Sequence, residues 1–148
     1  MEITEEVARR RQTIKLKDPG NAYSELRDLL EEKMSFSGVH EDKYVNDVDE
    51  GKVQAHIATE SSYDKFTGEK IDIYVTIDAE KGEMDFHAKA KLVTEYPEKY
   101  PHHETVWYYG YRSLFDKFLY GSVREGYKPA VDEKLETLMT RLRETLEA

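Results

Sequence analysis

The sequence predicts an α+β domain in which an antiparallel β-meander of about six strands carries helices on one face. Residues 70–78 and 83–93 alternate apolar and polar side chains with a period of two, as half-buried strands do. Short glycine-containing segments separate these runs from their neighbours, and links this short make adjacent strands antiparallel. Two further segments repeat apolar residues every three or four positions, which is the pattern of amphipathic helices.

The first predicted elements are a strand and a helix. Over residues 7–16, the apolar Ile14 and Leu16 alternate with polar residues, which indicates a strand. Asp18 followed by Pro19 is typical of an N-cap and a first helical residue, so a helix is expected from there to about residue 34. The buried stripe of this helix is expected to comprise Ala22, Leu26, Leu29, Leu30 and Met34.

The meander itself is expected to contribute four strands joined by tight turns. The strands are predicted over residues 39–48, 52–63, 70–78 and 83–93. The turns are predicted at residues 49–51, 65–68 and 79–82, each of which contains a glycine. Because the last two strands alternate so regularly, one face of the sheet should be dry and the other solvated.

The C-terminal third is expected to supply a sixth strand and two helices. Residues 103–111 are rich in β-branched and aromatic types, which favours a strand. Residues 112–126 have helical spacing, Gly126 to Pro129 interrupts it, and a long helix follows over residues 129–146. This last helix is expected to pack on one face of the sheet through Val131, Leu135, Leu138, Leu142 and Leu146, flanked by Met139.

Composition places the whole chain, residues 1–148, in a single domain. The formal net charge of -9 should repel nucleic acid and anionic membranes, so no nucleic-acid partner is expected. There is no cysteine, which excludes a thiolate nucleophile and fits a reducing cytoplasm. No apolar run approaches the roughly 18 residues of a membrane helix, so membrane insertion is not expected either.

Catalytic and metal-binding motifs are scarce. His102, His103 and Glu104 are suitable zinc ligands by type, but consecutive strand residues point to opposite faces, so no metal site is expected. No nucleophile motif or phosphate loop occurs, and no acidic pair stands out, so neither a catalytic residue nor a cofactor is expected. His56 and His87 lie on the polar faces of their strands and would be neighbours if those strands were adjacent.

Arg9, Arg10 and Arg11 form a basic stripe in an otherwise acidic chain. Because alternate side chains of a strand point to opposite faces, such a run is divided between the two faces. Salt bridges to acidic surface residues are therefore favoured over a phosphate-binding site.

The most unusual segment covers residues 106–111 and is dominated by aromatic residues, Trp107, Tyr108, Tyr109 and Tyr111. Aromatic side chains with a polar tip suit the wall of a pocket or the anchors of an interface, but a place in the core between sheet and helices is the favoured interpretation. The inward positions Ala55, Ala88 and Ala90 are small. They leave room either for a ligand or for a close approach of the C-terminal helix.

The order of elements resembles that of the START and polyketide-cyclase-like (SRPBCC) superfamily, which has the helix-grip fold. The residues that carry the likeness are Ile14, Leu16, Asp18, Pro19 and Leu26, with residues 53–92 and 131–142. The resemblance implies a curved sheet around the last helix, with a lipophilic ligand between them. The sequence departs from that family in having about six strands rather than seven and an additional helix over residues 112–126. The order also resembles cystatin-type folds, which implies binding to another protein.

The leading functional hypothesis is non-catalytic binding of a small hydrophobic or amphipathic ligand in a cavity between sheet and helix. The expected walls of this cavity are Ile73, Val75, Phe86, Ala88, Trp107, Tyr109, Leu135 and Met139. The first alternative is an interaction or assembly module, with a homodimer or partner surface around Trp107. The second alternative is a cyclase- or hydrolase-like enzyme that uses His56 or a tyrosine as its general acid.

Overall fold

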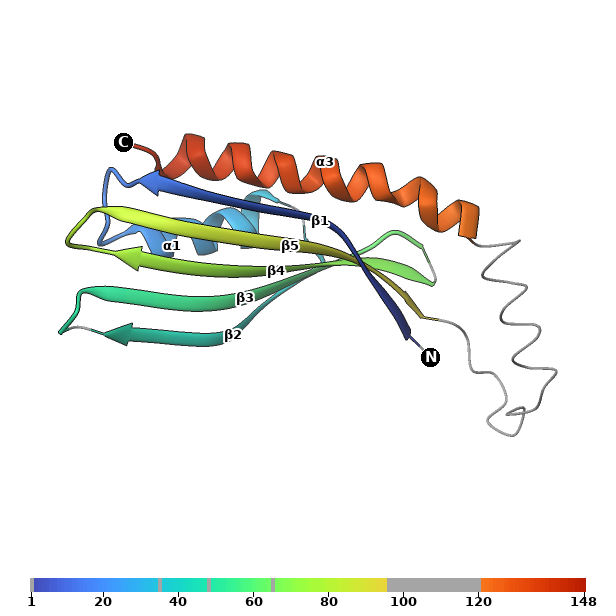
Figure 1. Ribbon diagram of the computed structural model, residues 1–148, viewed down its shortest axis with the longest axis horizontal. Helices are drawn as coiled ribbons and strands as arrows, with labels where there is room; N and C mark the ends of the chain where they lie inside the picture. Colours follow the sequence, from blue (N-terminus) through green and yellow to red (C-terminus); the bar gives the residue numbers. More distant parts are fainter. Residues whose placement is uncertain (1, 35, 48, 65, 96–120) are drawn as a thin grey trace.

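The computed structural model describes residues 2–34, 36–47, 49–64, 66–95 and 121–148. This part of the chain has an α+β fold, with a five-stranded antiparallel sheet in one layer and helices in the other (Figure 1). The strands are β1 (Glu2–Lys15), β2 (Gly38–Asp47), β3 (Lys52–Ser62), β4 (Thr67–Asp78) and β5 (Glu83–Glu95). The helices are α1 (Ala22–Asp28), which continues as the short π-helix η1 (Leu29–Lys33), and α3 (Gly121–Leu146).

The strand order is β1-β5-β4-β3-β2, and every neighbouring pair is antiparallel. Strands β2 to β5 form the predicted meander, and β1 completes the sheet beside β5. The described sheet thus has one strand fewer than the predicted six. The predicted strand over residues 103–111 and most of the predicted helix over residues 112–126 lie outside the described residues.

The alternation within β4 and β5 creates the predicted dry face. Ile73 lies opposite Ala88 and Val75 lies opposite Phe86, and all four side chains are buried. Between them in the sequence, Tyr74 points to the other face and is exposed. We call these two faces the inner and the outer face of the sheet.

Both helices pack on the inner face. The two predicted apolar stripes are buried along their whole length, and they form one cluster with the sheet. Helix α3 runs alongside β1 and contacts β1, β5 and α1 (Figure 1). The small Ala88 and Ala90 of β5 are fully buried within this cluster, as expected where a helix approaches a strand closely. Each large apolar side chain buried in this way contributes about 1.5–3 kcal/mol.

The first helix begins later than predicted. Asp18 does not cap it, because the N–H of Asn21 donates to the backbone oxygen of Asp18 at 3.2 Å and closes a turn. The helix begins at Ala22, after this turn. Proline followed by Gly20 suits the two central positions of a β-turn. The Asp-Pro pair therefore begins a turn here, and the prediction of a helix start was wrong.

The final helix begins earlier than predicted, at Gly121, and Pro129 lies inside it. Lys128 explains how the helix continues past the proline. Its Nζ lies 2.7 Å from Oε1 of Glu5 on β1 and 2.7 Å from Oε1 of Glu125 in the preceding turn. These contacts fix the residues before the proline against the sheet, so tertiary structure overrides the local helix-breaking signal.

Replacing Gly126 by alanine is expected to raise the free energy of unfolding by about 0.5–1 kcal/mol. Gly126 is exposed in the interior of α3, and a Cβ built on it meets no atom within 4 Å. Alanine would therefore reduce the entropy of the unfolded chain without a clash. Urea denaturation of the two proteins measures the difference, and a destabilised variant would show that α3 does not run unbroken through this position.

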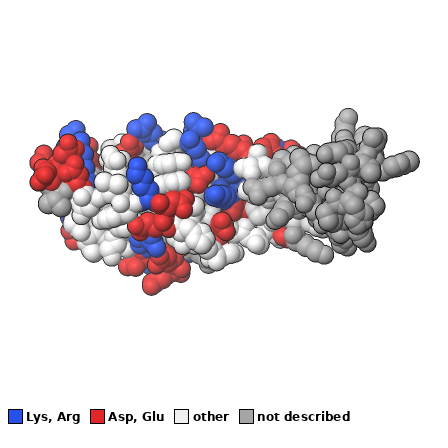
Figure 2. All heavy atoms as spheres, turned by 90° about the horizontal axis from the view of Figure 1, so that it is seen from below, with Lys and Arg blue, Asp and Glu red and all other residues white. Residues whose placement is uncertain are grey.

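The surface is densely charged. Figure 2 shows Lys and Arg side chains interspersed with Asp and Glu side chains over the described part of the molecule. Acidic side chains gather at the end that carries the β2–β3 and β4–β5 turns, where Asp47, Asp49, Glu50, Asp78 and Glu80 lie. None of the described helices has the length and apolar character needed to cross a membrane.

Candidate functional site

The inner face of the sheet changes from apolar to polar at the end where β3 joins β4. Along β4 the inward positions before Ile71 are Glu69 and Thr67, and both side chains are buried. Across the sheet, Ser61 pairs with Glu69 and Thr94 pairs with Thr67, and these side chains are buried too. We call this set, with Tyr63 and Lys134, the polar cluster. A buried polar set of this kind is informative because the inside of a small domain is normally apolar.

A buried ion pair lies at the centre of the polar cluster. The Glu69 side chain is 0% exposed, and Nζ of Lys134 on α3 lies 3.1 Å from its Oε1. The same Nζ donates to Oγ of Ser61 at 2.8 Å and lies 4.6 Å from the ring centroid of Phe36. The hydroxyl of Tyr63 donates to the other carboxylate oxygen, Oε2. The carboxylate thus has both a countercharge and a neutral donor, which a buried charge requires.

Tyrosine side chains join the β3–β4 turn to α3. Burial, with a smaller contribution from the Glu69 carboxylate, raises the pKa of Tyr63, so its hydroxyl remains a donor. The Tyr63 ring stacks on the ring of Tyr127 at a centroid distance of 5.1 Å. The Tyr127 hydroxyl donates to Oδ2 of Asp64 at 2.7 Å, and this hydrogen bond raises the pKa of Tyr127. These contacts hold the first turns of α3 over the polar cluster.

One buried hydroxyl of the polar cluster has no hydrogen-bond partner among the described residues. Thr94 is 0% exposed, and its Oγ1 neither donates nor accepts a hydrogen bond there. Leaving a buried hydroxyl unpaired costs about 1–3 kcal/mol, so such groups in native proteins usually contact water or a ligand.

An open pocket of about 410 Å³ borders the polar cluster on the β3–β4 turn. Three members of the cluster line it, Ser61, Thr67 and Glu69. Phe66 supplies apolar surface at the turn. Glu60, Ser62, Gly68, Lys70 and Val93 also line the pocket and belong to the outer face of the sheet, so the pocket only borders the polar cluster.

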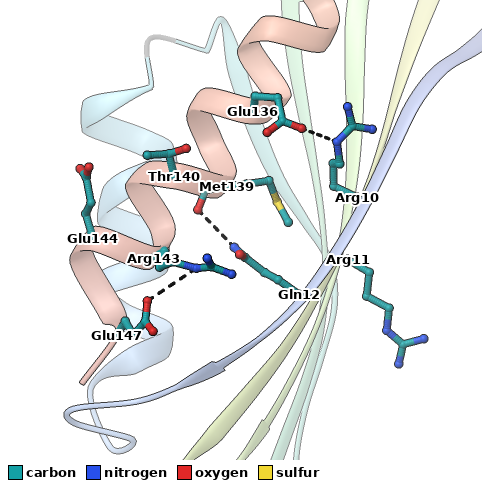
Figure 3. Close-up of a pocket in the computed structure, with 9 residues that line it drawn as sticks. All are labelled: Arg10, Arg11, Gln12, Glu136, Met139, Thr140, Arg143, Glu144 and Glu147. Atoms are coloured by element: carbon teal, nitrogen blue, oxygen red, sulfur yellow. Dashed lines mark hydrogen bonds and ion pairs between the residues drawn. The ribbon is translucent and has the colours of Figure 1, made fainter.

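A second hollow is a groove of about 590 Å³ between β1 and α3, shown in Figure 3. Arg10 reaches across it to Glu136 and, at 2.8 Å, to Oδ1 of Asp132. Gln12 donates to the backbone oxygen of Met139 at 3.2 Å. Because these charges are paired across the groove, the contacts fasten α3 to the edge strand and leave few free groups for a ligand.

The basic stripe divides as predicted. Arg10 turns toward α3, whereas Arg9 and Arg11 belong to the outer face. Arg9 donates to Glu6 at 3.0 Å, and Nη2 of Arg11 lies 2.7 Å from Oδ2 of Asp85. All three arginines are thus paired with acidic residues, and the prediction of salt bridging is confirmed.

The two histidines of the meander are not neighbours, because β4 lies between β3 and β5. His56 and His87 instead flank Tyr74 on the outer face, in register with it from either side. The condition for adjacent imidazoles is therefore not met, since three successive hairpins place β4 between the two strands. The His56 ring stacks on Tyr74 at 4.4 Å between centroids, and the His87 ring lies 6.2 Å from it.

The predicted cavity walls lie mainly in the packed core. The described members on the sheet and α3 all belong to one apolar cluster, which contains Ile73, Val75, Phe86, Ala88, Leu135 and Met139. Met139 also lines the groove beside β1. Trp107 and Tyr109 lie outside the described residues, as do His102, His103 and Glu104. No group of acidic and histidine side chains in the described residues could hold a metal ion.

The sequence matches no protein-family model and no curated protein. Among solved structures, a Staphylococcus aureus protein of unknown function is similar over 98% of this chain and 93% of its own, with 14% identity and a TM-score of 0.39. An uncharacterised protein from Rhizobium leguminosarum is similar over 95% of this chain and 99% of its own, with 13% identity and a TM-score of 0.23. TM-scores this low indicate neither a shared fold nor a shared function.

Proposed function

We propose that the protein binds a small amphipathic ligand without catalysis, and that the polar cluster holds the polar group of this ligand. The observation that carries the proposal is the buried Thr94 hydroxyl, which has no partner among the described residues. Thr94 is the direct cross-strand partner of Thr67, and Thr67 is among the residues that line the adjacent pocket. A ligand group that bonded to this hydroxyl would remove the cost of burying it unpaired.

The charges of the polar cluster favour an uncharged polar group. Glu69 and Lys134 neutralise each other, and Tyr63 is kept as a neutral phenol. An ionic ligand would have to displace one partner of this pair and leave the other buried without its countercharge, which is costly. A hydroxyl, ether or carbonyl group would add to the existing hydrogen bonds instead. Phe66, which lines the pocket at the turn, would contact the apolar part of the ligand.

The test measures thermal unfolding of the purified protein with three probes, 1-decanol, decanoate and decylamine. The three probes share a ten-carbon alkyl chain and differ in the charge of their polar group. We expect 1-decanol to raise the Tm more than either ion. Thr94→Val should raise the Tm of the unliganded protein, because it removes an unpaired hydroxyl, and should reduce the shift caused by 1-decanol. Thr76→Val, on the outer face of β4, is the matched control and should leave the decanol shift unchanged.

An equal response of the wild type and Thr94→Val to 1-decanol would contradict the proposal, as would a larger response to either charged probe. Native mass spectrometry of the purified protein adds an independent readout. A co-purified neutral amphiphile that is lost in Thr94→Val would support the site.

The two alternative functions remain predictions. For an assembly module, the relevant observation is the edge strand β2, whose Tyr44 and Val45 are each 43% exposed. A bulge between Glu41 and Lys43 interrupts its pairing with β3, and bulges and lysines are features that protect edge strands from pairing with other chains. For an enzyme, the proposed general acid is His56, which lies on the outer face between Asp42 and Asp72. It does not line either pocket described above.

A further inference from the structure

The centre of the outer face carries a row of aromatic rings. His56, Tyr74 and His87 lie side by side on β3, β4 and β5. The first two rings are nearly parallel, with an interplanar angle of 9°, and the third is tilted by 43°. Tyr74 is 42% exposed, although a large aromatic side chain on a sheet is usually covered. His56 thus covers one face of the Tyr74 ring, and the side toward the tilted His87 is less closely packed.

Cationic side chains surround this aromatic row. Nζ of Lys89 lies 5.7 Å from the centroid of the Tyr74 ring and forms no ion pair with any described residue. Arg9 and Arg11 lie on β1 beside Lys89 and His87. Burial and the charges of these three cations, Lys89 first, lower the pKa of His87. These cations lie together on β1 and β5, in a protein whose net charge is -9.

Two carboxylates of this region, Asp72 and Asp85, are paired with cations, and a third, Asp42, lies 3.7 Å from Nδ1 of His56. Burial alone would raise the pKa of Asp72, but the hydrogen bond and charge of Lys91, at 2.8 Å, outweigh it and lower that pKa. Asp72 is also 3.3 Å from Nε2 of His56. Asp85 is paired with Arg11. Among the described residues Lys89 has no ion-pair partner, and its ammonium group lies 5.7 Å from the Tyr74 ring centroid, so an anion can pair with it there.

We propose that the outer face binds a small aromatic anion, whose ring packs against Tyr74 on the side away from His56 and whose phosphate, sulfonate or carboxylate group contacts Lys89. Contact with an aromatic side chain favours the ring of the ligand, and the charge fixes the position of that ring. This site is separate from the polar cluster, which lies on the opposite face of the sheet and favours an uncharged group.

The probe is 1-naphthyl phosphate, followed by NMR of the ring signals of Tyr74, His56 and His87. Inorganic phosphate has the charge without the ring, 1-naphthol has the ring without the charge, and 1-naphthylmethylamine has the ring with the opposite charge. We expect 1-naphthyl phosphate to shift the three ring signals at the lowest concentration. The affinity should fall about tenfold in Tyr74→Leu, from the loss of stacking.

Lys89→Gln should also weaken binding and reduce its dependence on salt, because it removes the free cation. Lys52→Gln is the matched control, since Lys52 lies on the outer face at the far end of β3, opposite Asp47 and Asp78. It should bind 1-naphthyl phosphate as the wild type does. The proposal is overturned if 1-naphthylmethylamine shifts the same signals as strongly, if Tyr74→Leu binds like the wild type, or if no ring signal moves at millimolar concentrations.

Discussion

Replacing Lys134 by methionine is expected to lower the free energy of unfolding by about 3–5 kcal/mol, because it leaves Glu69 as a buried charge without its countercharge. The Glu69 side chain has no exposed surface, and Lys134 is the cation that contacts it. Methionine has a similar length to lysine, so the loss of packing is small and the measured change reports mainly the charge. Urea denaturation at neutral pH measures it.

A double variant separates the charge from the shape of these side chains. Glu69→Leu together with Lys134→Met removes both charges at once, and its stability should be closer to the wild type than that of Lys134→Met. The exposed pair of Arg143 and Glu147 on the same helix is the control. Its side chains are 57% and 48% exposed, so Arg143→Met should change the stability by less than about 1 kcal/mol. Equal effects of Lys134→Met and Arg143→Met would show that Glu69 is not buried as described.

The same ion pair shows what the sequence could have revealed about the candidate site. Glu69 lies two residues before Ile71 on β4, so its side chain points to the same face as those of Ile71, Ile73 and Val75. The alternation therefore already placed a charge on the dry face. Lys134 precedes Leu135 on the edge of the apolar stripe of α3. Each residue alone resembled one more surface charge in a highly charged chain. Only the packing of α3 against β1 and β5 brings Lys134 to Glu69 of β4, and local periodicity does not encode that contact.

The fold was predictable where the signal is local. The strand alternation and the two helical stripes depend on neighbours a few residues apart, and these were confirmed. The position of β1 beside β5, the passage of α3 through Pro129 and the separation of His56 from His87 depend on contacts between distant segments. The helix start at Pro19 failed for a different reason, since Asp-Pro-Gly-Asn suits a turn as well as a cap.

The largest effect expected within the core is that of Phe86→Ala, about 3–5 kcal/mol of lost stability. Phe86 is among the largest fully buried side chains, with an exposure of 0%, and it belongs to the apolar cluster between the sheet and the helices. Its removal leaves a cavity that this cluster fills only in part. Phe86→Leu should cost less, because leucine retains most of the buried surface, and it guards against a variant that does not fold at all.

The same variant decides whether the predicted cavity walls enclose space in the wild type. If the core is filled by side chains, benzene should raise the Tm of Phe86→Ala, because dry engineered cavities bind it, and should leave the wild type unchanged. If Phe86, Ala88 and Leu135 instead line a natural cavity, benzene should stabilise the wild type as well, and the loss from Phe86→Ala should be smaller. A wild type that does not respond would place ligand binding at the polar end of the inner face, where Thr94 lies, rather than in the middle of the core.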